Sequence, residues 1–241
     1  MKNPQSNAEG KKFVAAHAAR LVQDGMVAGM GTGSTIVFLI EELARRMREE
    51  GLKFVAVPTS FQSRILCLDL GIPVRDMQDT ASLDLAIDGA DEVDGALNLI
   101  KGGGASHTRE KIVAAMAKEF VVVVDESKLV SLLGSTFAIP IEVLPSARSY
   151  VERAVRDLGG APALRIGVRK DGPVVTDNGE LIFDVRFAPT ADLRAVDQAL
   201  HRIPGIIETG LFFDMVGSVL VGCGGADNQS LKTLRRGHRE G

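Results

Sequence analysis

The chain has 241 residues, of which 45% are hydrophobic and 24% are charged, and its formal net charge is −3. These values are ordinary for a globular protein, and the mixed charges argue against a nucleic-acid binder that uses a broad basic face. No apolar run approaches the ~20 residues that span a bilayer, and the polar N-terminal segment lacks the apolar core of a signal peptide, so we expect a cytoplasmic protein without a membrane partner.

Helices and short apolar strands alternate in the first half of the chain. We expect helices over 8–22 and 34–50 and two more that end near 70 and 118, with strands over 26–30, 54–57, 83–87 and 120–124. The last of these strands is apolar and β-branched, which is typical of a strand covered on both faces. This order predicts an open α/β, Rossmann-like layered domain with a mostly parallel sheet.

The pattern changes after about residue 139. We expect strands over 141–144, 164–168, 181–187 and 206–213, and helices over 149–158 and 192–201. This βαββαβ order predicts a small α+β domain of split-βαβ, ferredoxin-like type. A strand over 215–221 then returns to the first sheet. The small domain, 138–213, is therefore an insertion in a Rossmann-like catalytic domain of residues 1–137 and 214–241. Separately, we expect the basic segment 232–239 to be a solvated tail.

The glycine-rich segment Gly29–Thr35 joins the first strand to the second helix. Glycines let a ligand approach the backbone, and a helix N-terminus attracts anions, so a phosphate fits here. The spacing matches neither the dinucleotide fingerprint nor a P-loop. The alternative is a tight turn in which Ser34 caps the helix.

Four acids fall within the seven residues Asp88–Asp94, directly after an apolar strand. Ligands of open α/β sheets bind beyond the carboxyl ends of strands, where clustered carboxylates repel one another and raise at least one pKa. Such a group suits sugar hydroxyls, a metal or acid–base chemistry. The alternative is an acidic surface turn.

A lysine and three glycines form the segment Lys101–Gly104, and a helix carrying Glu110 follows. Three consecutive glycines cost conformational entropy on folding, so such a loop usually serves a close approach to its backbone. By spacing alone, Glu110 matches an ordinary solvated helix acid, which is the commoner case. Lys128, after the strand at 120–124, is compatible with the same cleft or with a solvated loop.

Several catalytic signatures are absent from the sequence. There is no HExxH and no GxSxG motif, and the histidines have no ligand spacing, so nothing requires a metal. His107 is expected at the surface. Cys67 and Cys223 form no CxxC pair, which indicates buried free thiols in a reducing compartment.

Five motifs occur in order along the chain: GTGST at 31–35, DGADEVD at 88–94, KGGGA at 101–105, TREK at 108–111 and DESK at 125–128. Together they resemble the A-type ribose-5-phosphate isomerases, over essentially the whole chain and including the inserted domain. The resemblance implies interconversion of D-ribose 5-phosphate and D-ribulose 5-phosphate in the non-oxidative pentose phosphate pathway. It also implies an enediol(ate) intermediate, no metal or organic cofactor, a sugar phosphate as ligand, and a homodimer or homotetramer.

Site residues follow from the same resemblance. Glu110 corresponds to the catalytic base, and Lys11 to a further phosphate contact. The substrate-binding positions are Thr32, Gly33, Ser34, Thr35, Asp88, Gly89, Ala90, Asp91, Lys101, Gly102, Gly103, Gly104 and Lys128.

The implied reaction opens the sugar ring and moves a proton between C2 and C1. We expect Asp88 to serve the ring-opening proton, Asp91 to shuttle protons between O1 and O2, and Lys101 with the glycine-loop amides to stabilise the enediolate. This mechanism requires Glu110 to lie on the same side of the sheet as the acidic turn and the triple-glycine segment.

Two other functions are compatible with parts of the sequence. One is an amino-sugar-phosphate deaminase or isomerase, which also opens a ring, although the inserted domain and the KGGGA–TREK pairing argue against it. The other is a sugar-phosphate sensor without catalysis, which is disfavoured by the retained Glu110, Asp88 and Asp91.

Overall fold

The computed structural model describes residues 4–224 and 229–236. The chain divides into two compact units: the first contains 1–90, 109–129 and 214–241, and the second contains 91–108 and 130–213. The predicted insertion, 138–213, falls within the second unit. That unit also takes in 91–108 and 130–137, which we had expected in the Rossmann-like domain. The reason is a small sheet in which β5 (Leu99–Ile100) pairs both with β4 (Glu92–Val93) and with β11 (Leu211–Phe212) of the second unit.

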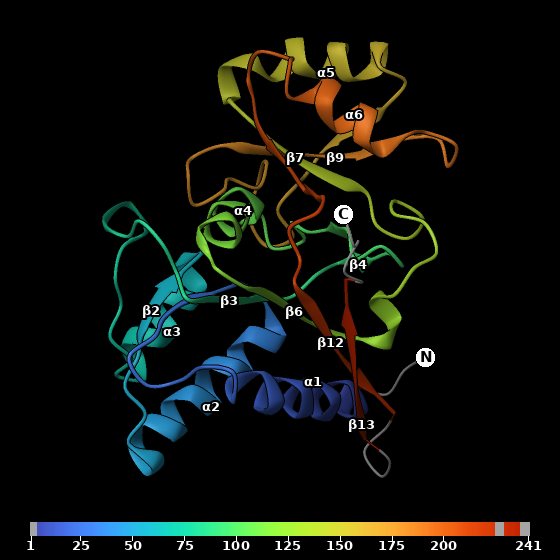
Figure 1. Ribbon diagram of the computed structural model, residues 1–241. Coiled ribbons are helices and arrows are strands. Elements are labelled where there is room, and N and C mark those ends of the chain that lie inside the picture. Colours follow the sequence, from blue (N-terminus) through green and yellow to red (C-terminus); the bar gives the residue numbers. More distant parts are fainter. Residues whose placement is uncertain (1–3, 225–228, 237–241) are drawn as a thin grey trace. The chain divides into compact units, whose positions relative to one another are not determined.

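The first unit is built on a six-stranded sheet in the order β13-β12-β6-β3-β1-β2 (Figure 1). Its strands are β1 (Val27–Met30), β2 (Val55–Pro58), β3 (Leu85–Asp88), β6 (Phe120–Asp125), β12 (Ser218–Cys223) and β13 (Ser230–Arg235). All neighbouring pairs are parallel except β12 with β13. The expected mostly parallel sheet and the return of the chain to it after the insertion are both confirmed.

The predicted solvated tail was wrong over residues 232–235. These residues belong to β13, which pairs along its whole length with β12. Leu231 and Leu234 are partly buried while Lys232 and Arg235 are exposed, so charged side chains lie on an edge strand of the sheet. Residues 237–239 of the predicted tail lie outside the described part of the chain.

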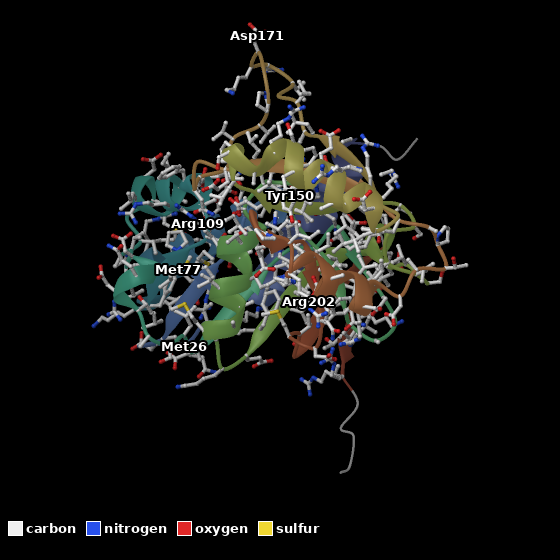
Figure 2. The ribbon with its side chains drawn as sticks, turned by 90° about the horizontal axis from the view of Figure 1, so that it is seen from above. Met26, Met77, Arg109, Tyr150, Asp171 and Arg202 are labelled. Atoms are coloured by element: carbon white, nitrogen blue, oxygen red, sulfur yellow. The ribbon has the colours of Figure 1, made fainter. Side chains whose placement is uncertain are left out.

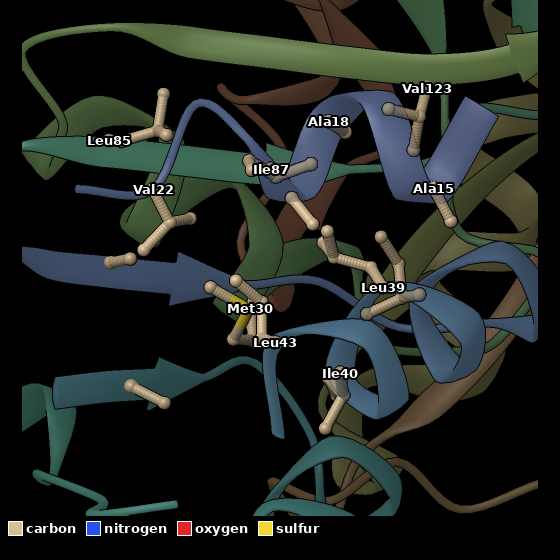
Figure 3. Packing of buried hydrophobic residues seen from close by; sticks show 14 of the residues in the cluster. Ala15, Ala18, Val22, Met30, Leu39, Ile40, Leu43, Leu85, Ile87 and Val123 are labelled. Carbon is tan, nitrogen blue, oxygen red and sulfur yellow. The ribbon is translucent and has the colours of Figure 1, made fainter. Parts of the chain in front are cut away.

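Helices cover the two faces of this sheet differently. The helices with residues in this unit are α1 (Pro4–Ala19), α2 (Ser34–Glu50), α3 (Phe61–Asp69) and α4 (His107–Met116). Figure 3 shows α1 and α2 packed through Ala18 and Leu39 onto Met30 and Ile87 of the strands. A Cβ at Gly29, which points to the opposite face, would lie 2.3 Å from Val113 of α4. Helix α4 therefore packs on the face away from α1 and α2.

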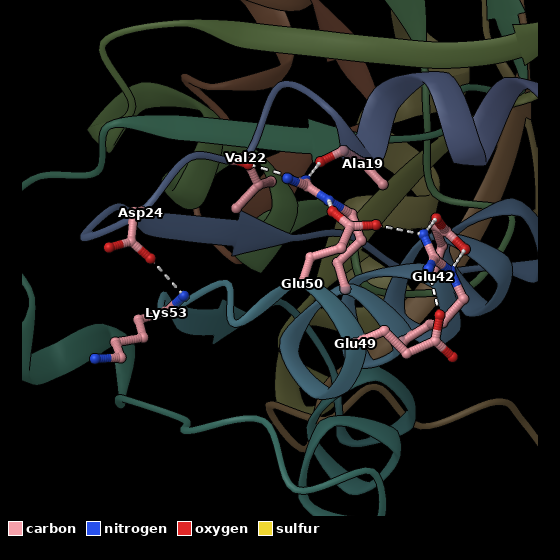
Figure 4. Close-up of polar contacts among 9 residues, drawn as sticks. Ala19, Val22, Asp24, Glu42, Glu49, Glu50 and Lys53 are labelled. Atoms are coloured by element: carbon pink, nitrogen blue, oxygen red, sulfur yellow. Dashed lines mark hydrogen bonds and ion pairs between the residues drawn. The ribbon is translucent and has the colours of Figure 1, made fainter.

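The first helix ends at Ala19, three residues before the predicted end. The guanidinium of Arg46 donates hydrogen bonds to the carbonyl oxygens of Ala19 and Val22, the latter at 3.0 Å (Figure 4). They connect the turn that follows α1 to Arg46 of α2, and the carbonyl oxygen of Ala19 also accepts the N–H of Val22 at 3.2 Å. Helix α2 begins and ends where the sequence predicts, and it stops at Gly51, which has φ +76°.

The second unit contains a four-stranded antiparallel sheet in the order β10-β7-β9-β8. Its elements are β7 (Ile139–Val143), α5 (Arg148–Asp157), β8 (Ala161–Leu164), β9 (Leu181–Arg186), α6 (Leu193–Leu200) and β10 (Ile206–Thr209), with a 3₁₀ turn at Pro145–Ala147. In the first unit, 3₁₀ turns span Met77–Asp79 and Glu126–Lys128. The connectivity of the second unit is the split-βαβ arrangement, which confirms the predicted fold class.

Two predicted strands of this unit differ in the structure. The strand expected over 206–213 is two strands, because the chain passes from one sheet to the other at Gly210, where a Cβ would lie 2.2 Å from the carbonyl oxygen of Lys101. The strand expected over 164–168 lies earlier, at Ala161–Leu164. Val168 is 99% exposed, and the loop that follows carries Asp171 at its tip (Figure 2).

Candidate active site

The first group of candidate residues lies where β1 and β3 end. The N–H of Gly31 donates to the carbonyl oxygen of Ile87 at 3.0 Å, which continues the pairing past β1. Oδ1 of Asp88 then accepts the N–H groups of Thr32 at 3.1 Å and Gly89 at 2.7 Å. Asp88 is 3% exposed. Its carboxylate is therefore held in one orientation at the carboxyl edge of the sheet.

The glycine loop leads directly into α2. Gly33 is the N-cap residue with φ +115°, and no side chain caps the helix, so the alternative in which Ser34 is the cap was wrong. Instead, the Oγ of Ser34 accepts a hydrogen bond from the ammonium of Lys11 at 2.8 Å. A helix N-terminus, a hydroxyl and an ammonium together suit an anion such as a phosphate.

Three residues that the sequence analysis did not assign hold this loop. The hydroxyl of Thr32 lies 2.9 Å from the hydroxyl of Thr59 and donates to Ser60 at 2.7 Å. The N–H of Gly33 donates to the side-chain oxygen of Gln62 at 3.0 Å. All three follow β2, which is the parallel neighbour of β1. A signal was available: polar residues directly after a predicted parallel strand lie at the same edge as the loop.

Glu110 is placed at this same edge by the packing of α4. The N–H of Leu83, just before β3, donates to the carbonyl oxygen of Met116 at 2.9 Å, so the end of α4 lies at the start of β3. Val113 packs against Gly29 in β1. Glu110 is one helical turn before Val113 on the same face, and hence nearer the carboxyl ends of the strands. Glu110 is 5% exposed, so it is not the ordinary solvated helix acid.

Lys128 also follows a strand of this sheet. It lies in the 3₁₀ turn after β6, which is the parallel neighbour of β3. The carboxylate of Asp125 fixes the turn by accepting the N–H of Ser127 at 2.8 Å. Lys128 is partly buried, which differs from a fully solvated loop residue. The first unit thus brings Lys11, Thr32–Thr35, Asp88–Ala90, Glu110 and Lys128 together along one sheet.

A cavity of about 540 Å³ opens in the first unit beside this edge. It is lined by Pro58, Ser60, Arg64, Asp76, Met77, Gln78, Arg109, Ile112 and Met116, of which Met77 and Arg109 are labelled in Figure 2. Ser60 touches Thr32 of the glycine loop. The guanidinium of Arg109 lies 5.7 Å from the ring of Phe61 at the start of α3.

The remaining candidates belong to the second unit. Lys101 is 3% exposed, and its ammonium lies 5.7 Å from the centre of the Phe212 ring. The backbone N–H of Lys101 donates to Gly210 at 2.9 Å. Oδ2 of Asp91 accepts the N–H of Gly103 at 2.8 Å. Gly102 has φ +118°, and a Cβ there would lie 2.8 Å from His107, so the loop depends on glycine at this position.

The acidic run does not act as one cluster. Glu92 is 0% exposed, and its carboxylate accepts hydrogen bonds from Gly134, Thr136 and Phe137 in the second unit. Asp94 accepts the N–H of Asn98 at 2.8 Å and closes a turn. These two acids therefore hold the chain in place and do not form one cluster with Asp88 and Asp91.

The burial of His107 and of the two cysteines differs in part from what the sequence predicts. His107 is 0% exposed, and its Nε2 lies 3.3 Å from the carbonyl oxygen of Glu208, so it is not a surface residue. Both cysteines are free thiols. Cys67 is buried, and burial raises its pKa to about 12, but Cys223 is only partly buried.

Over 4–224 and 229–236, no three histidine, cysteine or acidic side chains gather as a metal site would require. In the same ranges, none of the helices combines the length and apolar character that crossing a bilayer demands.

The chain resembles known proteins along most of its length. A family model described as ribose 5-phosphate isomerase A (phosphoriboisomerase A) matches residues 55–225. The ribose-5-phosphate isomerase A of Thermosynechococcus vestitus is 55% identical over 213 residues, which are 88% of this chain and 90% of the relative. That of Methanocaldococcus jannaschii is 48% identical over 232 residues, which are 96% of this chain and 100% of the relative.

Solved structures give the same result. Ribose 5-phosphate isomerase A from M. jannaschii superposes with a TM-score of 0.88 over 95% of this chain and 100% of that one. A D-ribose-5-phosphate isomerase in complex with phospho-erythronic acid, 41% identical, also has a TM-score of 0.88, over 95% of this chain and 98% of its own. The likeness extends to both compact units.

Proposed function

The chain belongs to the ribose 5-phosphate isomerase A family, and we propose that Glu110 is the base of its reaction. The protein is an isomerase that interconverts D-ribose 5-phosphate and D-ribulose 5-phosphate in the pentose phosphate pathway. The proposal concerns which of its residues perform each step.

The burial and placement of Glu110 support its role most directly. A C–H proton beside a carbonyl is a very weak acid, so a carboxylate removes it only when the carboxylate is close, desolvated and aimed. Glu110 is 5% exposed and lies in the first turn of α4, one turn from the contact of Val113 with Gly29. It therefore faces the edge at which Asp88 and the glycine loop lie.

The phosphate is assigned to the start of α2. Ser34 and Thr35 offer hydroxyls there, and Lys11 offers an ammonium that already bonds Ser34 at 2.8 Å. Lys128 supplies a second cation along the same sheet edge. Binding a phosphate remote from the reacting carbons lets binding energy orient those carbons toward Glu110.

Three further roles complete the proposal. Asp88, fixed by two backbone N–H groups, exchanges the proton of ring opening. In the second unit, Lys101 and the amides of Gly102–Gly104 stabilise the enediolate oxygens, and Asp91 moves protons between O1 and O2. Electrostatic stabilisation of this kind acts most strongly in a water-excluded site, and Lys101 is 3% exposed.

The decisive experiment is turnover by the purified protein. Formation of ribulose 5-phosphate from ribose 5-phosphate is followed with and without EDTA, for the wild type, Glu110→Gln and Glu110→Asp. Loss of a general base costs roughly 10²–10⁴-fold, so Glu110→Gln lowers kcat by that factor with a modest change in KM. The exposed Glu41 on α2 provides the control variant Glu41→Gln. A Glu110→Gln enzyme with near-wild-type kcat removes Glu110 from the role.

The same assay separates the two other candidate functions. An amino-sugar-phosphate enzyme would turn over an amino-hexose phosphate faster than ribose 5-phosphate in a substrate panel. A sensor would bind ribose 5-phosphate without converting it. The matched residues 55–225 and the full-length relatives favour the isomerase.

The proposal includes a cytoplasmic homo-oligomer, dimer or tetramer. Free thiols at Cys67 and Cys223 fit a reducing compartment. Phe61, Ile65 and Leu68 recur at helical spacing along α3 and are each more than half exposed, as expected of a helix face covered in an assembly. Light scattering on the purified protein measures the oligomeric state, and a monomer at micromolar concentration contradicts this part.

A further inference from the structure

We propose that Arg165, held by Asp184, is a positioning residue that fixes the glycine loop Gly102–Gly104 and, through it, the carboxylate of Asp91. The inference rests on the proposed function, in which that loop and Asp91 act on the substrate. Arg165 lies outside all five sequence motifs. It reaches the loop from the segment that follows β8.

One peptide group of the loop is bound at both ends. Nη1 of Arg165 donates to the carbonyl oxygen of Gly102 at 2.7 Å and lies 3.3 Å from that of Gly103. The N–H of Gly103 belongs to the same peptide group as the carbonyl of Gly102, and it donates to Oδ2 of Asp91 at 2.8 Å. A guanidinium therefore sets the direction of the carbonyl, and the N–H is thereby aimed at Asp91.

Arg165 is itself held rigidly. Its Nε and Nη2 donate to the two carboxylate oxygens of Asp184 at 2.9 and 2.5 Å. Such a bidentate pair is strong and geometrically specific. Asp184 lies in β9 between β7 and β8, and the side chain of Arg165 is 15% exposed. The sheet of the second unit is thus connected to Asp91 through an ion pair and one peptide group.

The loop cannot be stiffened from within. Consecutive glycines have wide backbone freedom. A Cβ at Gly102 would lie 2.8 Å from His107, and one at Gly103 would lie 2.8 Å from Oδ1 of Asp91. Side chains are therefore excluded at both positions, and the orientation of the peptide group depends on external hydrogen bonds. Without Arg165, the single bond from the Gly103 N–H to Asp91 would be left to oppose rotation of this group.

The arrangement requires arginine. One edge of the planar guanidinium pairs with Asp184 while Nη1 serves the loop, and the three bonds share one rigid fork. An ammonium has no such fork, so lysine at 165 keeps the charge but not the geometry. Charge alone is therefore insufficient for the proposed role.

The first test is steady-state kinetics of Arg165→Ala and Arg165→Lys beside Arg156→Ala. Arg156 forms an ion pair with Glu152 at 3.0 Å on α5, away from the loop. It therefore serves as the control for the Arg165–Asp184 pair. A small misplacement of a reacting group costs up to about 10²-fold, so both Arg165 variants lower kcat by roughly 10–100-fold. Arg156→Ala retains the wild-type kcat. Restoration of the wild-type rate by lysine at 165 overturns the proposal.

The second test separates positioning from general support of the fold. Asp91→Asn is combined with Arg165→Ala. If Arg165 acts through Asp91, its loss lowers kcat less than about threefold in the Asp91→Asn background, because residues that act as a unit are non-additive. A loss in that background as large as in the wild type indicates a merely structural role and overturns the proposal.

A third readout is independent of turnover. Hydrogen exchange at the Gly103 amide is compared in the wild type, Arg165→Ala and the milder Asp184→Asn. Protection at this amide falls in both variants while protection in β9 persists; unchanged protection at Gly103 overturns the inference.

If the wild type turns over ribose 5-phosphate and Glu110→Gln does not, a normal Arg165→Ala rate refutes this inference alone. If the wild type has no turnover, the proposed function fails, and the Gly103 exchange still decides whether Arg165 fixes the loop.

Discussion

A Cβ atom at Gly31 would lie 2.0 Å from Oδ1 of Asp88, so the two residues leave no room for a side chain where β1 and β3 end. The approach is required because the Asp88 carboxylate accepts the N–H of Thr32, the next residue, at 3.1 Å. The glycine at 31 thus brings the backbone of the phosphate loop to the carboxylate proposed for ring opening.

We expect Gly31→Ala to lower kcat by about 10²-fold, because the methyl group displaces the Asp88 carboxylate from its two backbone donors. The φ of Gly31 is not in the left-handed region, so the effect arises from the clash and not from backbone strain. Gly95→Ala is the matched control, since a Cβ at Gly95 meets nothing within 4 Å. Steady-state kinetics with both variants check this, and equal rates for the two would show that Asp88 tolerates displacement.

Ser34→Ala and Lys11→Met should mainly raise KM, because both remove groups assigned to the phosphate. A hydrogen bond to a charged group contributes about 1.5–3 kcal/mol, so an increase of roughly tenfold or more is expected for each. The two residues share a hydrogen bond of 2.8 Å, so the double variant should lose less than the product of the single losses. A loss confined to kcat argues against phosphate binding at this helix.

Much of this edge could be predicted because its determinants are local. The alternation of apolar strands and helices predicted the bounds of α2 correctly. The position of the motifs directly after strands predicted that they lie at the carboxyl edge of the sheet. The support from Thr59, Ser60 and Gln62 depends on which strand lies beside β1, a long-range fact. Likewise, Glu92 and Asp91 are neighbours in an acidic run, and only the fold shows that Glu92 is buried by residues 134–137.

The division of the chain shows the same limit. The two-residue strands β4 and β5 are too short for a periodic signal, yet the pairing of β5 with β11, and of β4 with β5, places 91–108 in the second unit. The predicted helix at 8–22 also ends early, at Ala19, and the carbonyl oxygens of Ala19 and Val22 bond Arg46 of α2. Both differences are accompanied by contacts between residues distant in the sequence, which a local pattern does not contain.

Phospho-erythronic acid should inhibit the protein competitively against ribose 5-phosphate. A relative 41% identical has been solved in complex with this compound, which carries a phosphate and a carboxylate. The carboxylate presents negative charge as an enediolate does, so Lys101 and the glycine-loop amides should bind it. Inhibition constants for the wild type and Lys101→Met should differ by at least tenfold. Equal constants would exclude Lys101 as a partner of the enediolate.

Glu92→Ala should destabilise the fold by at least about 3 kcal/mol, because a hydrogen bond to a charged group contributes about 1.5–3 kcal/mol and the variant loses several of them. The carboxylate accepts the N–H groups of Gly134, Thr136 and Phe137 at 2.6 Å and the Thr136 hydroxyl at 2.5 Å. Urea denaturation measures the loss, with the exposed Glu41→Ala as control. Hydrogen exchange at 134–137 should rise selectively. Equal unfolding midpoints for Glu92→Ala and Glu41→Ala would show that water accepts these hydrogen bonds when the carboxylate is removed.

His201 should make the stability of the second unit depend on pH. Partial burial by itself lowers the pKa of the His201 imidazole. The backbone bond to Asp197 and the side chains of Glu208 and Asp197 raise the pKa by more than this, so it lies above the ordinary value of 6.5. Nε2 lies 2.8 Å from the Glu208 carboxylate, and Nδ1 lies 3.5 Å from that of Asp197.

The sign follows from this upward shift. The folded state binds the His201 proton more tightly than the unfolded state does, so the contribution is complete below pH 6.5 and is lost as pH rises through the folded pKa. Wild-type melting temperature should therefore fall in that window by more than that of His201→Asn. NMR titration of the His201 ring measures the pKa directly, and a value below 6.5 would reverse the predicted slope. The Thr209 hydroxyl donates to the Asp197 carboxylate and its backbone N–H donates to Glu208, so Thr209→Val removes the first bond and keeps the second.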